Sequence, residues 1–523
     1  MLTALAKRIL RAGDRAWLAV RSLRARRLEA GQRPVQRDGR WYLARVVEPA
    51  PVAELIRGSL DLVTAACREE GAWFAVLPAA DGQSTRVAIR DEAAPAVLGR
   101  LVAAGQERAW YAWPRGRRRA GLLRDLDPAT SAGPIRIFQV AALADGGIVA
   151  GPEHACHLVL AGEDGGLLEV GPDNLVAERF PADAPASTVE VLGRTYPTVA
   201  PFGRTGHLGA VEFPIDVVYT WVDGNDPAWR ASRDEYLGAA GRLNEEAANA
   251  SRWIDRDELR YSLRSLHLHA EWVNHVWLVT AGHVPAWLDV DHPGLTVVTH
   301  EEIFPDPGVL PTFNSHAIEA QLHRIPGLAE HYLYFNDDVH LGRRVPPRRF
   351  FQPNGVPHFF PSRYHLDLGP ARPEDPPVMA AGKNGRDLLE ARYGRIATQK
   401  LKHTPHPQRR STMAALEATF PEEFRRTSAS RFRSLTDVSV ASSLVHHFAY
   451  LEEKAVPADL PYRYIDLVDP GLEDWMERTA AQRPLDVFCV NDTTGTPEQL
   501  AARGPLLQRF LADYFPLPSP FER

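Results

Sequence analysis

The chain has 523 residues, enough for two to four domains, with an ordinary globular composition of 45% hydrophobic and 24% charged residues. Its net charge of −6 excludes a strongly basic protein, so we expect no nucleic-acid partner. Cys67, Cys156 and Cys489 are too few and too dispersed for a disulfide framework or a zinc cluster, which favours a reducing compartment. No apolar run approaches the roughly 18 residues that a membrane-spanning helix needs.

Residues 1–37 combine helix-forming and basic residues. Leu5, Ile9 and Val20 recur at helical spacing, which predicts a basic amphipathic helix. This helix could lie on an anionic membrane surface, or it could pack on the protein body or a partner, including a second copy of the chain. No signal-peptide core or cleavage site follows it, so we expect a cytoplasmic protein, either free or peripheral on the inner face of the membrane.

Residues 38–125 predict a small accessory domain. Strands and helices alternate in the order βαββαβ, which is the order of a ferredoxin-like unit. Residues 126–205 carry short apolar runs separated by Gly-Gly pairs, which indicates a segment rich in β-hairpins. Neither segment shows chemistry, and we expect an α+β accessory or assembly region before a second domain at residues 206–523.

The second domain opens with residues 215–222, a β-branched and aromatic strand that runs into an acidic loop. Gly224 would let the backbone approach a phosphate there, and Asp223 or Asp226 could bind a ribose hydroxyl or a metal. A tight turn is the alternative. This strand is typical of the first strand in a nucleotide-binding sheet.

A helix is predicted over residues 256–266, with leucines on one face. Arg260 and Arg264 lie four residues apart, so both guanidinium groups project to one side of it. They could bind a diphosphate, or they could pair with Asp257 and Glu258.

Two further strands, at residues 276–280 and 295–298, precede a polar loop that contains Thr312, Asn314 and His316. A helix start follows this loop and would attract an anion, so we expect these side chains to bind substrate. The alternation of strands and helices over residues 214–340 predicts an α/β, doubly wound, Rossmann-like sheet.

The buried strand at residues 332–335 ends in Asn336, Asp337 and Asp338. Two adjacent carboxylates are costly to bury, and a divalent cation such as Mg²⁺ or Mn²⁺ removes that cost. Asp492 follows another apolar run near the end of the chain and could supply a further metal ligand. A strand ending in a solvated turn is the alternative for the Asn-Asp-Asp sequence.

His403 and His406 flank a proline, so they cannot form a helical zinc pair. One of them could act as an acid–base group, because histidine titrates near neutral pH; a polar surface residue is the alternative.

Four blocks together resemble the Stealth family, which includes bacterial capsule and cell-wall hexose-1-phosphate transferases and the precursor of the lysosomal-enzyme GlcNAc-1-phosphotransferase. The motifs that carry the resemblance are DVVYTWVDG, DELRYSLRSL, LPTFNSHAIE, NDDV, HTPHP, TSASRFR and VNDTTG. They cover residues 214–495 and leave residues 1–205 outside.

The resemblance implies a GT-A-like α/β fold, a divalent metal, a UDP-sugar donor and a glycan acceptor. It implies transfer of a sugar-1-phosphate to a sugar hydroxyl in capsule or cell-wall polysaccharide synthesis, with release of UMP. By motif, Asn336, Asp337 and Asp338 fall in the acidic active-site block of the family, and His403 and Arg433 match its functional histidine and arginine. The alternatives are a metal-dependent glycosyltransferase that releases UDP and a non-catalytic glycan-binding protein.

Overall fold

The computed structural model describes residues 31–37, 40–50, 52–77, 85–106, 108–129, 133–145, 147–174, 176–203, 208–239, 255–491 and 495–523. The chain divides into two compact units, with the main boundary between Ala210 and Val211. Residues 476–483 and 510–517 belong to the first unit and the rest of the C-terminal part to the second. No helix in the described ranges is both long and apolar enough to span a bilayer.

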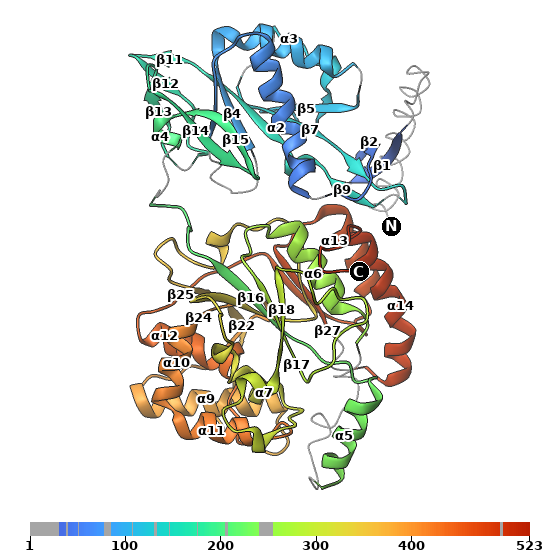
Figure 1. Ribbon diagram of the computed structural model, residues 1–523, viewed down its shortest axis with the longest axis vertical. Coiled ribbons are helices and arrows are strands. Elements are labelled where there is room, and N and C mark those ends of the chain that lie inside the picture. The colour runs from blue at the N-terminus through green and yellow to red at the C-terminus, as the bar shows by residue number, and fades with distance from the viewer. Residues whose placement is uncertain are drawn as a thin grey trace. The chain divides into compact units, whose positions relative to one another are not determined.

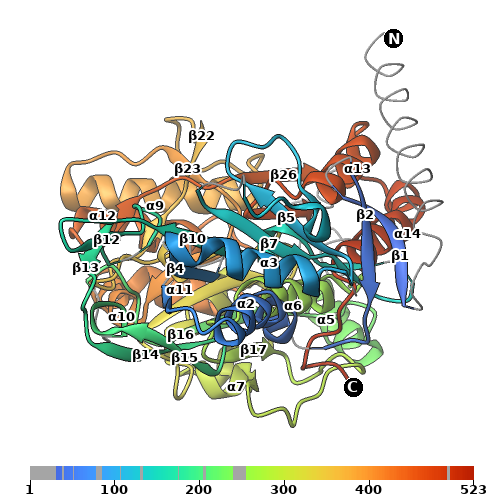
Figure 2. The ribbon, with the colours of Figure 1, turned by 90° about the horizontal axis from the view of Figure 1, so that it is seen from above.

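The first unit is built on a six-stranded sheet with the order β3-β4-β10-β7-β5-β6. Helices α2 (Val52–Glu69) and α3 (Ala94–Ala104) pack together over one face of it (Figure 2). The strands are β3 (Phe74–Leu77), β4 (Thr85–Arg90), β5 (Trp110–Pro114), β6 (Gly121–Leu122), β7 (Ile135–Gln139) and β10 (Cys156–Ala161).

Smaller sheets complete this unit. The first has the order β1-β2-β8-β9, the second β11-β12-β13, and β14 and β15 form a hairpin that is followed by α4 (Ala200–Gly203). Their bounds are β1 (Gln32–Arg37), β2 (Arg40–Val46), β8 (Ala141–Ala142), β9 (Ile148–Ala150), β11 (Glu163–Asp164), β12 (Leu167–Glu169), β13 (Arg179–Pro181), β14 (Ala186–Val191) and β15 (Arg194–Val199). The expected hairpins are present at β8–β9 and β11–β12.

The ferredoxin-like prediction for residues 38–125 is wrong, although the element order βαββαβ is present. Strand β2 buries Tyr42 and Ala44 against Tyr111 and Phe138, and it lies in the sheet with β1 rather than beside β3 and β4. Strand β4 pairs instead with β10, from the segment predicted as separate hairpins. Residues 38–125 and 126–205 therefore share one fold.

The predicted helix over residues 1–37 is wrong at its C-terminal end, and residues 1–30 lie outside the described residues. Residues 32–37 form β1, which pairs antiparallel with β2. Val35 and Arg37 are buried with exposed Gln36 between them, and this period of two, together with Pro34, suits a strand.

The second unit is an α/β domain, as predicted, and its central sheet has the order β18-β17-β16-β19-β24. The first four strands are parallel and β24 is antiparallel to β19, which makes the sheet mixed. The strands are β16 (Ile215–Thr220), β17 (Val276–Thr280), β18 (Leu295–Thr299), β19 (His331–Asn336) and β24 (His406–Arg409).

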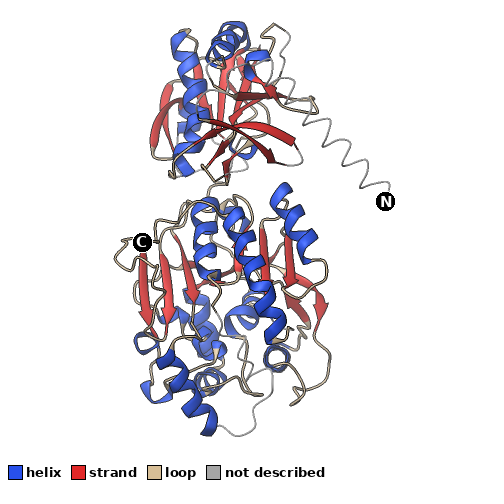
Figure 3. Cartoon of the chain, turned by 90° about the vertical axis from the view of Figure 1, so that its right-hand side faces the viewer, coloured by secondary structure: helices blue, strands red, loops and turns tan. Residues whose placement is uncertain are grey.

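Helices cover both faces of this sheet, so its strands are apolar on both sides (Figures 1 and 3). On one face lies α6 (Glu258–His269), which buries Leu259, Leu263 and Leu266 as the sequence predicted. The other face packs against the helices of the segment 315–451, which are α8 (Ser315–Glu319), α9 (Pro377–Tyr393), α10 (Arg410–Thr419), α11 (Pro421–Ala429) and α12 (Val445–Leu451).

After β19 the chain enters a separate small sheet, which has the order β20-β27-β26. Its strands are β20 (Val339–Leu341), β26 (Tyr462–Asp466) and β27 (Val487–Asn491). The remaining elements are the strand pairs β21 (His358–Phe359) with β25 (Val456–Pro457) and β22 (Pro361–His365) with β23 (Gln399–Leu401), and the helices α5 (Pro227–Ala239), α7 (His300–Ile303), α13 (Leu472–Gln482) and α14 (Pro497–Tyr514).

Candidate active site

A cavity of about 510 Å³ lies in the second unit, at the carboxyl end of the parallel strands. This is the edge where ligands of α/β sheets bind, and the volume suits a substrate of nucleotide-sugar size. Seven of the predicted site residues line it: Thr312, His316, Asn336, Asp337, Asp338, His403 and Arg433.

The Asn-Asp-Asp sequence is placed by two strand pairings. Strand β19 runs parallel to β16, with Asn336 beside Thr220, so its carboxyl end lies at the cavity. Directly after the turn, β20 pairs antiparallel with β27, and Val339 lies opposite Cys489. The acidic turn is therefore held between the central sheet and the small sheet.

Asp338 is the most strongly hydrogen-bonded carboxylate of the turn. Asn491 Nδ2 and Cys489 Sγ donate to its Oδ2 at 2.7 and 3.1 Å, and His403 Nε2 lies 3.2 Å from its Oδ1. Burial alone would raise the pKa of Asp338, but His403, Cys489 and Asn491 stabilise the anion and lower the pKa to about 2. Asp338 is therefore ionised at neutral pH.

Asp337 has the opposite electrostatic environment. Burial raises the pKa of Asp337 well above its ordinary value, and the charges of Asp338, Glu258 and Asp255 raise it further. Burial, followed by neighbouring carboxylates, also raises the pKa of Glu258 to about 8 and that of Asp255 to about 6. Asp337 is therefore the carboxylate that is most strongly repelled, by Asp338, Glu258 and Asp255.

This donor set fits a divalent cation, because oxygen ligands suit Mg²⁺ and Mn²⁺ and a cation would relieve the repulsion. Asp337 and Asp338 would hold the ion, with Asn336 adjacent. Asp338, His403 and Cys489 also place one ligand atom each within 4.8 Å of one another, so a nitrogen or sulfur ligand is within reach.

His403 reaches Asp338 because β24 runs antiparallel to β19. The start of β24 therefore lies beside the carboxyl end of β19, and His403 comes shortly before that start. Burial lowers the pKa of His403, but the charge of Asp338 and the contact with it outweigh burial, so the pKa is raised. The ring is a stronger proton acceptor as a result, and a smaller fraction of it is neutral at a given pH.

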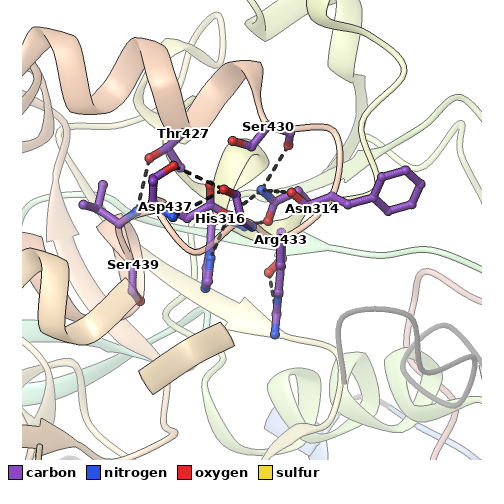
Figure 4. A network of polar contacts seen from close by, with 12 residues as sticks. Asn314, His316, Thr427, Ser430, Arg433, Asp437 and Ser439 are labelled. Atoms are coloured by element: carbon purple, nitrogen blue, oxygen red, sulfur yellow. Dashed lines mark hydrogen bonds and ion pairs between the residues drawn. The ribbon is translucent and has the colours of Figure 1, made fainter. Parts of the chain in front are cut away.

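Arg433 lies in the segment that follows α11, and its NH2 donates to Ser315 Oγ at 2.8 Å (Figure 4). Ser315 opens helix α8, so this contact joins the loop of Arg433 to the helix that carries His316. The two side chains extend from the network in the same direction in Figure 4, and both line the cavity.

Arg260 and Arg264 are not among the described residues that line the cavity, so the cavity gives no support to the prediction that they bind a diphosphate. Arg260 Nε donates to Glu522 Oε2 at 2.7 Å, and Arg264 donates to both oxygens of Glu522 at 2.7 Å. The Glu522 side chain is only 3% exposed. Burial lowers the pKa of Arg260, but the hydrogen bond and charge of Glu522, followed by the charge of Asp257, outweigh burial and raise it.

Asn314 is buried behind the cavity wall, so its predicted contact with substrate is replaced by a scaffold role. Its Oδ1 accepts from the N–H of His316 and caps helix α8. Its Nδ2 donates to the carbonyl oxygens of Ser430 and Phe432 and to Asp437.

Asp223 and Gly224 form a turn next to the cavity but are not among the described residues that line it. Asp223 Oδ1 accepts from the N–H of Asn225, and the carbonyl of Gly224 accepts from Arg230, so the alternative of a tight turn describes them. Asp492 lies outside the described residues.

Sequence reasoning missed several lining residues. The sequence predicts a helix that contains Arg256 and Glu258, with Glu258 only as a possible partner of Arg260 and Arg264, and it indicates no role for three other lining residues, Glu319, Tyr464 and Asn491. The signal for Asn491 was available, since it ends the same apolar run that led to Asp492.

The cavity region corresponds to conserved parts of a known family. Conserved region 1 of the Stealth proteins matches residues 213–241, region 2 matches residues 252–359, region 3 matches residues 402–450 and region 4 matches residues 478–523. The acidic turn lies in region 2, and His403 and Arg433 lie in region 3.

Similar curated proteins cover most of the chain. An exopolysaccharide phosphotransferase of Streptomyces coelicolor is 42% identical over 526 residues, covering 92% of this chain and 86% of that protein. A second protein of that name from the same organism is 40% identical over 530 residues, covering 96% and 89%. The exopolysaccharide phosphotransferase CpsY of Mycobacterium tuberculosis is 38% identical over 342 residues, covering 64% and 63%.

Among solved structures, the galactosyltransferase LgtC aligns with a TM-score of 0.29 and 10% identity, covering 57% of this chain and 95% of that one. Because all four conserved regions are present in order and relatives of 40% identity or more extend over nearly the whole chain, the protein belongs to the Stealth family.

Proposed function

We propose that the protein transfers a sugar-1-phosphate from a UDP-sugar to a hydroxyl group of a glycan acceptor in exopolysaccharide synthesis. The observation that carries the proposal is that one cavity gathers Asp337, Asp338, His403 and Arg433 from segments far apart in the sequence. The similarity to proteins named exopolysaccharide phosphotransferases supports the phosphotransferase class.

The proposed reaction forms a bond between the acceptor oxygen and the sugar-linked phosphorus of the donor. The bond between that phosphorus and the bridging oxygen breaks, and UMP leaves with the bridging oxygen. The product is a phosphodiester. Such transfers depend on positioning and charge neutralisation more than on covalent catalysis by the protein.

Each side chain then has a role that follows from its place. Arg433, steadied by Ser315, would contact the oxygens of the transferred phosphate, where a fixed guanidinium stabilises developing charge. His403 would accept the proton of the acceptor hydroxyl; His316 is the alternative acceptor. A divalent ion on Asp337 and Asp338, Mg²⁺ or Mn²⁺, would supply charge neutralisation for the diphosphate.

The rest of the wall can bind donor and acceptor. Trp221, Trp229 and Phe313 offer aromatic surface, and Arg256 and Lys400 offer positive charge. Burial lowers the pKa of Lys400, because it disfavours the charged ammonium, whereas an arginine stays charged. We therefore propose Arg256 in place of Arg260 and Arg264 as a cation near the phosphates.

The test is to incubate the full chain with Mg²⁺ or Mn²⁺, a glycan acceptor and a panel of UDP-sugars, and to measure UMP and UDP separately. We expect UMP release together with a phosphodiester resonance in the ³¹P spectrum of the glycan. UDP release with a plain glycosidic product would show an ordinary glycosyltransferase. Binding of glycan without consumption of any donor would indicate a non-catalytic protein.

A further inference from the structure

The carboxylate of Asp437 is fully buried behind the cavity wall. Its Oδ2 accepts from Asn314 Nδ2 at 2.8 Å and from the N–H of Ser434 at 2.8 Å. The same oxygen lies 3.5 Å from His316 Nδ1 (Figure 4). One carboxylate therefore contacts the loop before α8, the imidazole that lines the cavity and the segment that follows Arg433.

His316 is fixed at its backbone as well as at its ring. Its N–H donates to Asn314 Oδ1 at 3.1 Å, and Asn314 itself is bonded to Asp437. The His316 side chain is 2% exposed, and Asp437 is entirely inaccessible. Movement of the imidazole is therefore limited to small rotations in a packed wall.

Two buried atoms point to a specific pairing. In the described structure His316 Nδ1 and Asp437 Oδ1 have no hydrogen-bond partner, although both are shielded from solvent. Buried polar atoms are rarely left without a partner, and these two belong to side chains already at ion-pair distance. A small rotation of the ring would let Nδ1–H donate to the carboxylate.

We infer that Asp437 is a positioning residue for the transfer reaction, holding His316 with Nδ1–H toward its carboxylate and Nε2 toward the cavity. This inference deepens the proposed function and rests on it. With Nδ1 protonated, the Nε2 lone pair faces the cavity that Arg433 also lines, and it can accept a proton or hydrogen bond from an acceptor hydroxyl. Carboxylates fix histidine tautomers in this way in other catalytic sites.

A purely structural role predicts something different. Asp437 also ties Ser434 and Asn314 together, so it could matter only because it holds the loop of Arg433 in place. In that case the effect of losing the carboxylate would be independent of His316. The two roles therefore differ in whether the loss of activity caused by removing the Asp437 carboxylate depends on the His316 imidazole.

The first measurement uses the tautomer of His316 and needs no turnover. In the full chain labelled with ¹⁵N-histidine, the His316 resonances are assigned by their loss in His316→Ala. We expect the Nδ1-protonated tautomer in the wild type and its loss in Asp437→Asn. A His316 ring protonated only on Nε2 in the wild type would overturn the inference, whether or not the proposed transfer is observed.

The second measurement is a double-mutant cycle on turnover, with the UDP-sugar that the wild type consumes. We expect Asp437→Asn to lower kcat about 10–100-fold with the KM for the donor changed less than about threefold. In the His316→Ala background the same substitution should change kcat less than about threefold. Independent, multiplying effects would refute a role through His316. Absence of transfer by the wild type with every donor would contradict the proposed function instead.

Asp486→Asn is the matched control. Asp486 is also a buried carboxylate of this unit, it pairs with Arg343 and Arg349, and it is not among the described lining residues. We expect its substitution to lower thermal stability while kcat per folded molecule stays within about twofold.

If Asp437→Asn does not fold, His316→Ala offers a second route, because the removed ring can be replaced from solution. Imidazole has an N–H for Asp437 and a second nitrogen for the cavity, whereas 1-methylimidazole has no N–H. We expect imidazole to restore part of the activity and 1-methylimidazole to restore none. Equal rescue by both compounds, or by neither, would count against the inference.

Discussion

Glu522→Gln is predicted to destabilise the second unit by about 3 kcal/mol at pH 7. The Glu522 side chain is 3% exposed and receives three hydrogen bonds from Arg260 and Arg264, which are 32% and 12% exposed. Removal of one partner from a buried ion pair costs about 3–5 kcal/mol, and we take the low end because Arg260 is partly solvated.

The pH dependence of this contribution has a defined sign. Burial raises the pKa of Glu522, but Arg264, the N–H of Ser519 and Arg260 outweigh burial and lower it below its ordinary value of 4.5. The folded state therefore favours the ionised form, and the stabilisation is present above the unfolded pKa. It is lost as the pH falls through the lower, folded pKa.

The assay is equilibrium unfolding in urea, followed at pH 7 and at several values below pH 4.5, with Glu422→Gln as the control. Glu422 pairs with Arg425 on the surface, with both side chains more than 70% exposed, so its loss should change stability by less than about 0.5 kcal/mol. A Glu522→Gln effect as small as that of the control would refute the reasoning, because it would mean that the two arginines are free to bind a ligand.

The remaining predictions concern the site and the acid stability of the domain. Asp337→Asn should raise the unfolding temperature of the metal-free protein, because it removes repulsion among the buried carboxylates, and should abolish the further rise that Mg²⁺ produces in the wild type; an unchanged or lower temperature without metal would contradict this. His403→Ala should lower kcat about 10²–10⁴-fold while donor affinity, measured by calorimetry, changes less than about threefold; near-wild-type turnover would exclude His403 as the base. Burial lowers the pKa of His300 to about 4, so the unfolded state binds its proton first and stability should fall by up to about 3 kcal/mol as the pH decreases from about 6.5 to 4. His300→Phe should flatten the urea-midpoint profile over that pH range, and a profile as steep as that of the wild type would contradict the assignment.

Local sequence pattern was sufficient to predict many of the helices and strands of the second unit. Leu259, Leu263 and Leu266 recur at helical spacing and do form the buried face of α6, and the apolar run before Asn336 is a fully buried strand. These features depend on neighbours within one or two turns or on strand alternation, so the sequence contains the necessary information.

Partners from distant segments could not be predicted. The carboxylate that binds Arg260 and Arg264 lies more than 250 positions away at Glu522. In the first unit, β4 takes β10 as its neighbour, and nothing in residues 38–125 indicates that the sheet needs a strand from beyond them.

Two site assignments could have been better from the sequence. Strand alternation places Cys489 and Asn491 on the same side of β27, and both donate to Asp338. Asn491, which ends the strand, was therefore a better candidate for the site than Asp492, which follows it. Asn314 directly precedes a short helix, which is the usual place of an N-cap, and capping uses the side-chain oxygen that a ligand would need.

The small sheet β20-β27-β26 pairs two strands that the ribosome makes far apart in time, β20 and β27. Asp338 is made about 150 residues before Cys489 and Asn491, the two donors that hold its Oδ2. During synthesis Asp338 therefore lacks these two hydrogen-bond donors until β27 has been made and has paired with β20. A nascent polypeptide that stops before Cys489 would therefore lack both donors to Asp338, and the proposed site would be complete only after β27 has been made.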